Sequence, residues 1–175
     1  AEGYPDRLSN MSAALSKIRE RLAANGWKVL SADPLRLTLA APAGQSGTAL
    51  ADRLRQGGVE CEYADRDFLV LMVTPENNPQ DMERLLTALG ENRAPHVPLR
   101  ALPLARGAQV LPIRQALFAP HELVPADRAL GRVCGAPTVS CPPAIPIAVS
   151  GERIGREALE LFRHYGVERV DVVRE

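Results

Sequence analysis

The chain has 175 residues, 46% of them apolar, and its 21 basic and 21 acidic side chains give a formal net charge of zero. This length fits one large domain or two small ones with a core of ordinary size. The zero net charge argues against a nucleic-acid binder, and the lack of an apolar run of about 18 residues argues against a membrane span.

The first residues and the cysteines add two expectations. The opening Ala-Glu-Gly-Tyr-Pro has no signal-peptide pattern and does not look like a natural start, so we expect a fragment of a longer protein. Cys61, Cys134 and Cys141 are odd in number, lie far apart and match no metal-ligand spacing, which fits a reducing, cytoplasmic compartment. Cys141 is a candidate reactive thiol, although loop cysteines are usually inert.

Helical and extended patterns alternate in the first half of the chain. Apolar residues at spacings of three and four predict a first helix that ends at Asn25-Gly26. Short strands are expected at residues 27–30 and 35–39, and Thr48 can cap the next helix. The apolar stripe of the first helix consists of Leu8, Met11, Leu15, Ile18 and Leu22.

A continuous apolar run at residues 68–73 predicts a central strand, because strands of this kind are covered on both faces. A strand at 59–63 is expected before it and an amphipathic helix after it. Glu60 and Glu62 lie two residues apart on the expected strand, so their side chains face the same side. If that side of the strand faces solvent, the two glutamates form a charged edge of the sheet, and the spacing favours this interpretation. If it meets a cleft, a carboxylate there can bind a cationic group.

The resulting order of helix, two strands, helix, two strands and helix makes the first unit an α+β layer. Prolines interrupt every period between residues 90 and 109, which predicts a linker before a second small α+β unit. The elements expected in that unit are a helix at 111–119, a turn at 120–125, helical residues at 126–130, an extended segment at 132–139, a helix at 154–165 and a strand at 167–173.

The most constrained stretch is residues 140–154, Ser-Cys-Pro-Pro-Ala-Ile-Pro-Ile-Ala-Val-Ser-Gly-Glu-Arg-Ile. Proline fixes φ and keeps the preceding residue extended, so Pro142, Pro143 and Pro146 predict a stiff loop. Residues 146–149 are expected to form a short buried strand. So rigid a loop either holds something in place or packs a corner of the fold, and the residue types favour the two equally.

The sequence shows none of the common catalytic or nucleotide-binding motifs. The sequence has neither a G-x-G-x-x-G pattern nor a Walker loop. His96, His121 and His164 are scattered without helical ligand spacing, so each is expected at the surface rather than as a base or a ligand.

The proline-rich stretch and the Pro-Ile-Arg-Gln-Ala-Leu-Phe segment at residues 112–118 closely resemble the C-terminal domain of the bacterial Orn/Lys/Arg decarboxylases. The stretches that begin at Asp33 and Gly58 resemble the part of these enzymes that follows the large cofactor domain. The family uses pyridoxal phosphate and has an aminotransferase-like fold. The resemblance therefore implies an aminotransferase-like small domain at residues 1–92, a linker at 93–108 and the C-terminal domain at 109–175.

The resemblance also implies what the chain lacks. The family's Ser-x-His-Lys pattern, whose lysine holds the cofactor, is absent, and Lys17 and Lys28 are the only lysines. The chain is therefore expected to be non-catalytic alone and to bind no cofactor, while the full-length enzyme uses pyridoxal phosphate. Its expected partners are the missing large domain of the same polypeptide, further copies in a homodimer or higher oligomer, and a basic amino-acid substrate: arginine, ornithine or lysine.

Four candidate substrate-binding residues follow from the resemblance, and Arg36 is a fifth candidate by its residue type. The frame Gly-Val-x-x-Glu assigns the carboxylate that meets the distal cation of the substrate to Glu62 and not to Glu60. Arg36 can hold a carboxylate, although an arginine on a strand is more often solvated or in a structural ion pair. The remaining three, at the junction of the C-terminal domain with the rest of the enzyme, are Cys141, Pro142 and Glu152.

Two hypotheses of different classes follow. An accessory part of a decarboxylase predicts an exposed apolar face on the first unit, where the large domain would sit. A stand-alone binding or interaction module that keeps the fold without the chemistry predicts a polar, self-contained surface. A third hypothesis is a thiol-dependent function at Cys141. It would be excluded if a Cys141→Ser variant kept its activity.

Overall fold

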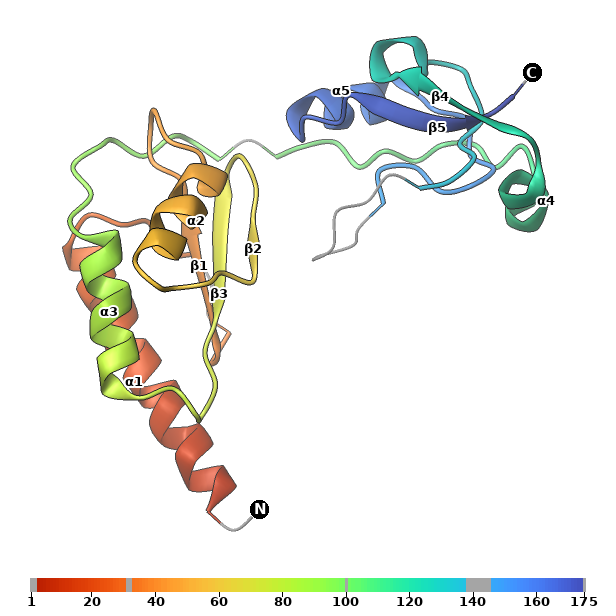
Figure 1. The fold of residues 1–175 in the computed structure, drawn as a ribbon. Helices are drawn as coiled ribbons and strands as arrows, with labels where there is room; N and C mark the ends of the chain where they lie inside the picture. Colours follow the sequence, from red (N-terminus) through yellow and green to blue (C-terminus); the bar gives the residue numbers. More distant parts are fainter. Residues whose placement is uncertain (1–2, 31–32, 100, 138–145, 175) are drawn as a thin grey trace. The chain divides into compact units, whose positions relative to one another are not determined.

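A computed structural model describes residues 3–30, 33–99, 101–137 and 146–174 (Figure 1). The chain divides into two compact units, Ala1–Leu99 and Arg100–Glu175. Each combines helices with a small antiparallel sheet, which confirms the predicted α+β class. Among the described residues, no helix is long and apolar enough to cross a membrane.

A three-stranded antiparallel sheet forms the centre of the first unit. The strand order is β1-β3-β2, so the apolar strand β3 is central, as predicted. The strand expected at 27–30 reduces to an isolated bridge between Val29 and Leu39. The elements are α1 (Tyr4–Ala24), β1 (Arg36–Ala40), α2 (Gly47–Gln56), β2 (Tyr63–Ala64), β3 (Phe68–Met72) and α3 (Pro79–Leu89).

The expected strand at 59–63 is wrong, because β2 contains only Tyr63 and Ala64. The alternation of inward- and outward-facing side chains breaks just before β2. Cys61 and Ala64 both pack against the core, although they lie three residues apart. Glu60 and Glu62 therefore do not share one face of a strand as the sequence pattern suggested.

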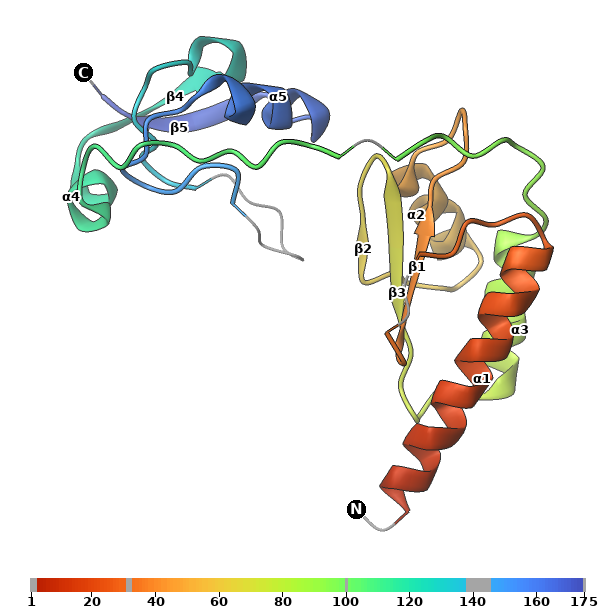
Figure 2. The ribbon, with the colours of Figure 1, turned by 180° about the vertical axis from the view of Figure 1, so that it is seen from behind.

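The three helices of the first unit all lie on one side of the sheet (Figures 1 and 2). Alternate strand residues point to that side, so Leu37 and Leu39 of β1 meet Leu69 and Leu71 of β3 in the core. The helices contribute the stripes expected from their periodicity. Trp27 closes one end of the core, and its Nε1 donates to the carbonyl oxygen of Gly90 at 2.9 Å.

The opposite side of this sheet is not covered by any described helix of the unit, and we call it the open face. Three half-buried side chains lie in a row across its middle: Val70 of β3 pairs with Thr38 of β1 on one side and with Tyr63 of β2 on the other. Met72 pairs with Arg36 in the next row and is 50% exposed. The open face consists of Arg36, Thr38, Tyr63, Phe68, Val70 and Met72.

The second unit has a two-stranded antiparallel sheet of β4 and β5. The segment expected to be a turn at 120–125 is β4, and residues 146–149 form no strand, so both expectations are wrong. The two helices and the closing strand are confirmed, with slightly shorter bounds. The elements are α4 (Ile113–Phe118), β4 (His121–Pro125), the 3-10 turn η1 (Ala126–Arg128), α5 (Arg156–His164) and β5 (Arg169–Val173).

The core of the second unit is small and lies between α5 and the sheet. Phe162 of α5 is almost fully buried with Val170 and Val172 of β5. Ile154, just before α5, and Cys134, which bridges to Val172, complete this core. Each unit therefore has its own apolar cluster.

The two faces of the first sheet predict different sensitivities to truncation. Leu69→Ala removes a fully buried side chain and is expected to lower the unfolding free energy by about 2–5 kcal/mol. Met72→Ala, three residues further along β3, is expected to lower it by less than about 1 kcal/mol, because that side chain is half exposed. Urea unfolding followed by Trp27 fluorescence measures both, and equal losses would contradict the assignment of the two faces.

Candidate functional site

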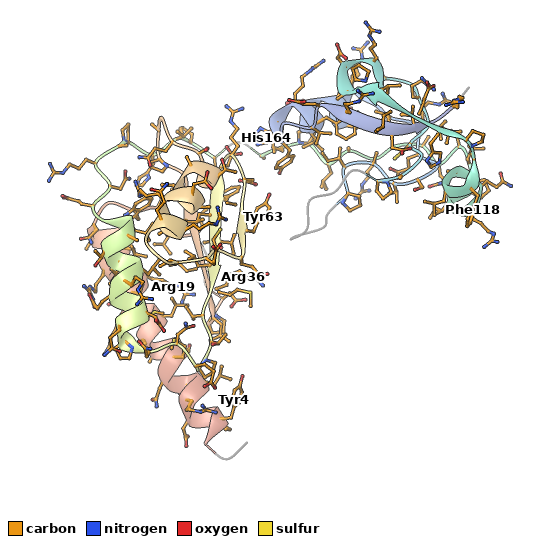
Figure 3. All side chains as sticks on the ribbon, in the orientation of Figure 1. Tyr4, Arg19, Arg36, Tyr63, Phe118 and His164 are labelled. Atoms are coloured by element: carbon orange, nitrogen blue, oxygen red, sulfur yellow. The ribbon has the colours of Figure 1, made fainter. Side chains whose placement is uncertain are left out.

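The open face is the candidate site of the first unit, because two of the predicted binding residues lie on it or at its edge. Figure 3 shows Arg36 and Tyr63 on this sheet. The Tyr63 hydroxyl donates to Asp65 Oδ2 at 2.8 Å, and Asp65 Oδ1 accepts from the backbone of Asp67 and Phe68. The hydroxyl and this carboxylate therefore hold the turn between β2 and β3.

Glu62 and Glu60 lie in different surroundings. Glu60 is exposed, and Arg55 Nε donates to both of its oxygens at 3.0 and 3.2 Å, so its charge is paired. Glu62 is exposed immediately before β2, and its backbone N–H donates to Val70 O at 2.9 Å. The backbone position of Glu62 is thus fixed by the sheet while its carboxylate faces solvent.

Arg36 begins β1 at the other edge of the sheet. Its side chain is exposed, and its carbonyl oxygen accepts from Arg19 at 2.7 Å, which holds the backbone of the strand end. Because β3 lies between β1 and β2, Arg36 and Glu62 flank that strand from opposite sides. The structure does not bring them into contact as an ion pair within the described residues.

Glu152 has a local structural role in the second unit. Its Oε2 accepts from the Val149 N–H at 3.0 Å, and its own N–H donates to Val149 O, so the residue closes the turn over 149–152. Gly151 in this turn has φ of 88°, and its N–H donates to Cys134 O at 2.8 Å. The Gly151-Glu152 pair therefore ties this turn to the backbone of the buried Cys134.

Cys141 and Pro142 lie outside the described residues. The proposed roles of this loop, and the candidate thiol chemistry at Cys141, remain predictions from the sequence.

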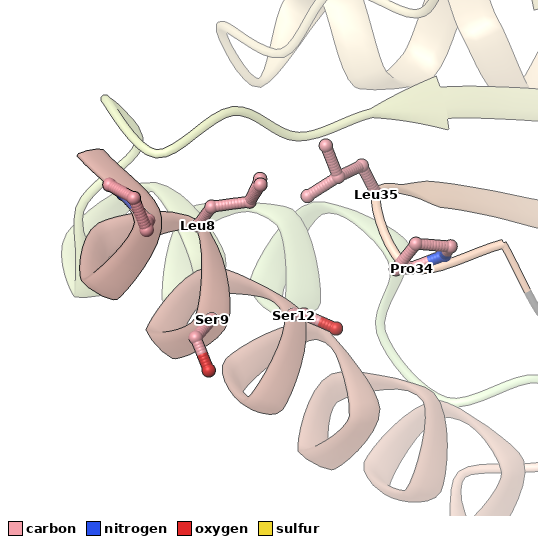
Figure 4. Close-up of a pocket in the computed structure, with 6 residues that line it drawn as sticks. Leu8, Ser9, Ser12, Pro34 and Leu35 are labelled. Carbon is pink, nitrogen blue, oxygen red and sulfur yellow. The ribbon is translucent and has the colours of Figure 1, made fainter. Parts of the chain in front are cut away.

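Two hollows of the first unit lie away from the predicted residues. One of about 400 Å³ lies between the start of α1 and the turn before β1, where Leu8 and Leu35 point toward each other (Figure 4). Another of about 450 Å³ lies between α1 and the start of α3, over Met11 and Met82, with Lys17 at its rim. Neither is lined by Glu62 or Arg36.

Pattern analysis of the sequence missed a polar pair in the second unit. His121 is half-buried, so the expectation of a surface position is wrong for this histidine. Its Nδ1 lies 2.9 Å from Asp171 Oδ1, and its Nε2 lies 2.7 Å from the carbonyl oxygen of Ala116. The pairing of β4 with β5 brings these residues together across fifty positions of sequence, and no local spacing signals it.

The described cysteines and acidic residues offer little catalytic chemistry. Burial, with the negative charges of Asp171 and Glu152, raises the pKa of the Cys134 thiol to about 11, and burial also raises the pKa of Cys61. Within the described ranges, no group of three or more His, Cys, Asp or Glu side chains is placed to hold a metal ion.

Comparison with known protein families finds no matching family. The chain is 29% identical over 140 residues to the arginine decarboxylase of Bacillus subtilis, and the match covers 73% of this chain and 28% of the relative. It is 27% identical over 134 residues to the uncharacterised protein YaaO of the same organism, with the same coverage. The chain thus matches about a quarter of the length of these curated relatives.

Two solved structures share the fold. The lysine decarboxylase LdcF of Francisella novicida aligns with 98% of this chain at a TM-score of 0.69 and 11% identity, over 40% of its own chain. The constitutive lysine decarboxylase of Escherichia coli aligns with 81% of this chain at a TM-score of 0.56 and 14% identity, over 32% of its own chain. These comparisons confirm the resemblance to the C-terminal portion of basic amino-acid decarboxylases that the proline-rich stretch suggested.

The turn at Gly151 predicts a steric requirement for glycine. A Cβ at this position would press into the carbonyl oxygen of Leu111 in addition to the strain of a positive φ, so Gly151→Ala is expected to destabilise the second unit by about 3 kcal/mol or more. Gly131→Ala is the control, because Gly131 has φ of 80° and open space around it, and about 1–2 kcal/mol is expected. Amide hydrogen exchange of β5 measures both losses, and an equal effect would refute the steric role.

The surroundings of the two described cysteines predict a reactivity order. At pH 8 about a thousandth of Cys134 is thiolate, and the side chain is buried, whereas Cys61 is half-buried. Iodoacetamide is therefore expected to label Cys61 at least about tenfold faster than Cys134 in the folded chain. Peptide mass spectrometry measures the two rates, with urea-unfolded protein as the control in which they converge. Labelling of Cys134 as fast as Cys61 before unfolding would contradict the burial.

Proposed function

We propose that this chain is the C-terminal portion of a pyridoxal-phosphate-dependent basic amino-acid decarboxylase, which helps to shape the substrate entrance and is not catalytic alone. The observation that carries the proposal is the similarity of 73% of the chain to a quarter of an arginine decarboxylase. Residues 1–92 would be the small domain, 93–108 the linker and 109–175 the C-terminal domain. The whole enzyme would act on arginine, ornithine or lysine.

The open face supports this proposal over a stand-alone module. A strand that is apolar at every position is typical of sheets covered on both faces, and β3 reads Phe-Leu-Val-Leu-Met. Within the described part of the first unit, helices cover only the side of Leu69 and Leu71. The side of Phe68, Val70 and Met72 suits contact with a further part of the same polypeptide, and we propose the large cofactor domain as that part.

The cofactor itself is assigned to the rest of the polypeptide. Pyridoxal phosphate needs an enclosed lysine for its aldehyde and a partner for its pyridine nitrogen. Lys17 is exposed on α1 and Lys28 is only half-buried, so the lysines of this chain do not fit the cofactor. Its carbanion chemistry would be supplied by the large domain, and this chain would contribute binding and positioning.

Glu62 is the proposed contact for the distal cation of the substrate. A carboxylate pairs well with an ammonium or guanidinium group once a second surface excludes water from it. Glu62 is exposed and fixed at the sheet edge by its backbone, whereas Glu60 is already occupied by Arg55. Arg36, Cys141, Pro142 and Glu152 are proposed as further residues of the entrance, with Glu152 acting through the turn that it closes.

A decarboxylation assay on the protein encoded by the complete gene tests the proposal. With pyridoxal phosphate, we expect CO₂ release from at least one of arginine, ornithine and lysine. Glu62→Gln is expected to lower kcat/KM by about ten- to a hundredfold, because it removes a charge-assisted contact. Glu60→Gln is the matched control and is expected to change kcat/KM by less than about twofold.

The outcomes separate the parts of the proposal. No release from any of the three substrates, or a gene that ends at the length of this chain, would overturn the decarboxylase assignment. Activity that falls equally in the two glutamate variants, or in neither, would leave the decarboxylase assignment in place and remove the role of Glu62.

A further inference from the structure

A groove between α1 and the start of α3 lies on the first unit, and neither Glu62 nor Arg36 lines it. The two helices lie side by side (Figures 1 and 2), and the groove has a volume of about 450 Å³. Its floor is formed by the buried side chains of Met11, Ile18 and Met82. We call it the α1–α3 groove. An apolar hollow of this volume is typical of sites for small molecules.

The hollow follows from one small residue on α1. Residues seven apart on a helix lie almost in line, because seven residues make nearly two turns. Arg7, Ala14 and Arg21 form such a row, with the short side chain in the middle, and all three line the groove. Ala14 therefore leaves the apolar floor open between two long side chains.

An ion pair closes each end of the α1–α3 groove. Arg7 Nη1 lies 2.9 Å from Glu76 Oε1, just before α3. Arg21 donates to both carboxylate oxygens of Glu83 on α3. The two arginines are about 21 Å apart along the axis of α1, at 1.5 Å per residue. The occupant of the groove is therefore compact, since a long helix or strand would have to cross one of these pairs.

Lys17 gives the rim of the groove an unbalanced positive charge. The carboxylates of Glu76 and Glu83 are each paired with an arginine. The ammonium group of Lys17, one turn after Ala14, has no ion-pair partner among the described residues. A ligand with an anionic end would thus find a cation at the rim, whereas a cationic ligand would meet repulsion.

The chemistry of the floor indicates the other end of the ligand. The thioether of methionine is polarisable and makes favourable contacts with aromatic rings, and its flexible side chain adapts to their shape. We propose that the α1–α3 groove is a binding site for a compact aromatic carboxylate. The ring lies on Met11 and Met82, and the carboxylate pairs with Lys17.

The three methionines of the chain let one experiment locate the ligand. Met11 and Met82 form the floor of the groove, whereas Met72 lies on the open face. The probe is phenylbutyrate, added to the 175-residue chain with ¹³C-labelled methionine methyl groups. The methyl signals of Met11 and Met82 are expected to shift and saturate while that of Met72 stays in place. A ligand of about twelve non-hydrogen atoms is expected to have a Kd on the order of a millimolar.

Two analogues of the probe test the charge at the rim. Phenylbutanol and phenylbutylamine keep the ring and the chain but carry a neutral or a positive end. Both are expected to bind about three- to tenfold more weakly than phenylbutyrate, because they lack the charge-assisted contact with Lys17.

Variants of α1 test the shape and the charge of the groove separately. Ala14→Leu fills the hollow with a residue that favours helices and is expected to weaken phenylbutyrate binding at least about tenfold. Lys17→Gln is expected to weaken phenylbutyrate about three- to tenfold and to leave phenylbutanol unchanged. Lys28→Gln is the matched control, since Lys28 is the only other lysine and does not line the groove.

Three results with the wild-type chain would overturn the proposal, even if a variant fails to fold. They are a response at Met72 alone, no saturation at Met11 and Met82, and equal affinity for the three probes. Shifts of Met11 and Met82 that depend on protein concentration without a probe would mean that a second copy fills the groove, and would also overturn it. None of these measurements uses decarboxylase activity, so their outcome is independent of the test of Glu62.

Discussion

The pairing of β3 between β1 and β2 is the constraint on which the first unit depends. Its register puts Leu69 and Leu71 opposite Leu39 and Leu37, and this row is where all three helices pack. The same register fixes what lies on the other side, because side chains alternate along a strand. The core cannot form without also displaying Phe68, Val70 and Met72 on the open face. The apolar character of that face is therefore a consequence of the strand sequence and its pairing together.

The second unit depends on a different kind of constraint. Its core is smaller, and much of its order comes from turns and backbone contacts rather than from buried area. Gly151 donates to Cys134, Glu152 holds the turn around Val149, and β4 is joined to β5. On β4 and β5, His121 and Asp171 are diagonal neighbours, since His121 pairs with Val173 and Leu123 pairs with Asp171. A two-residue offset in a ladder thus creates the polar pair that contacts α4.

The sequence predicted the elements whose signal is local. The stripe of α1, the amphipathic pattern of α3 and the apolar run of β3 each specify their structure without help from distant residues. β4 was missed, because prolines border it and His121-Glu122 do not look like a strand start. Its strand form is decided by β5, which lies more than forty residues away. The His121–Asp171 pair was missed for the same reason.

The candidate site was predictable only as far as the resemblance reached. Spacing treated Glu60 and Glu62 as equivalent, and the frame Gly-Val-x-x-Glu chose Glu62. The structure adds a physical difference, since Arg55 neutralises Glu60. With Glu62 at the β2 edge and Arg36 at the β1 edge, the open face has opposite charges on its two sides and apolar side chains between them. A surface that covers this face without leaving a buried charge unpaired must offer an apolar centre, an anion toward Arg36 and a cation toward Glu62. In the proposed function, a basic amino-acid substrate at that edge would be the source of this cation, so one sheet would serve both packing and substrate binding.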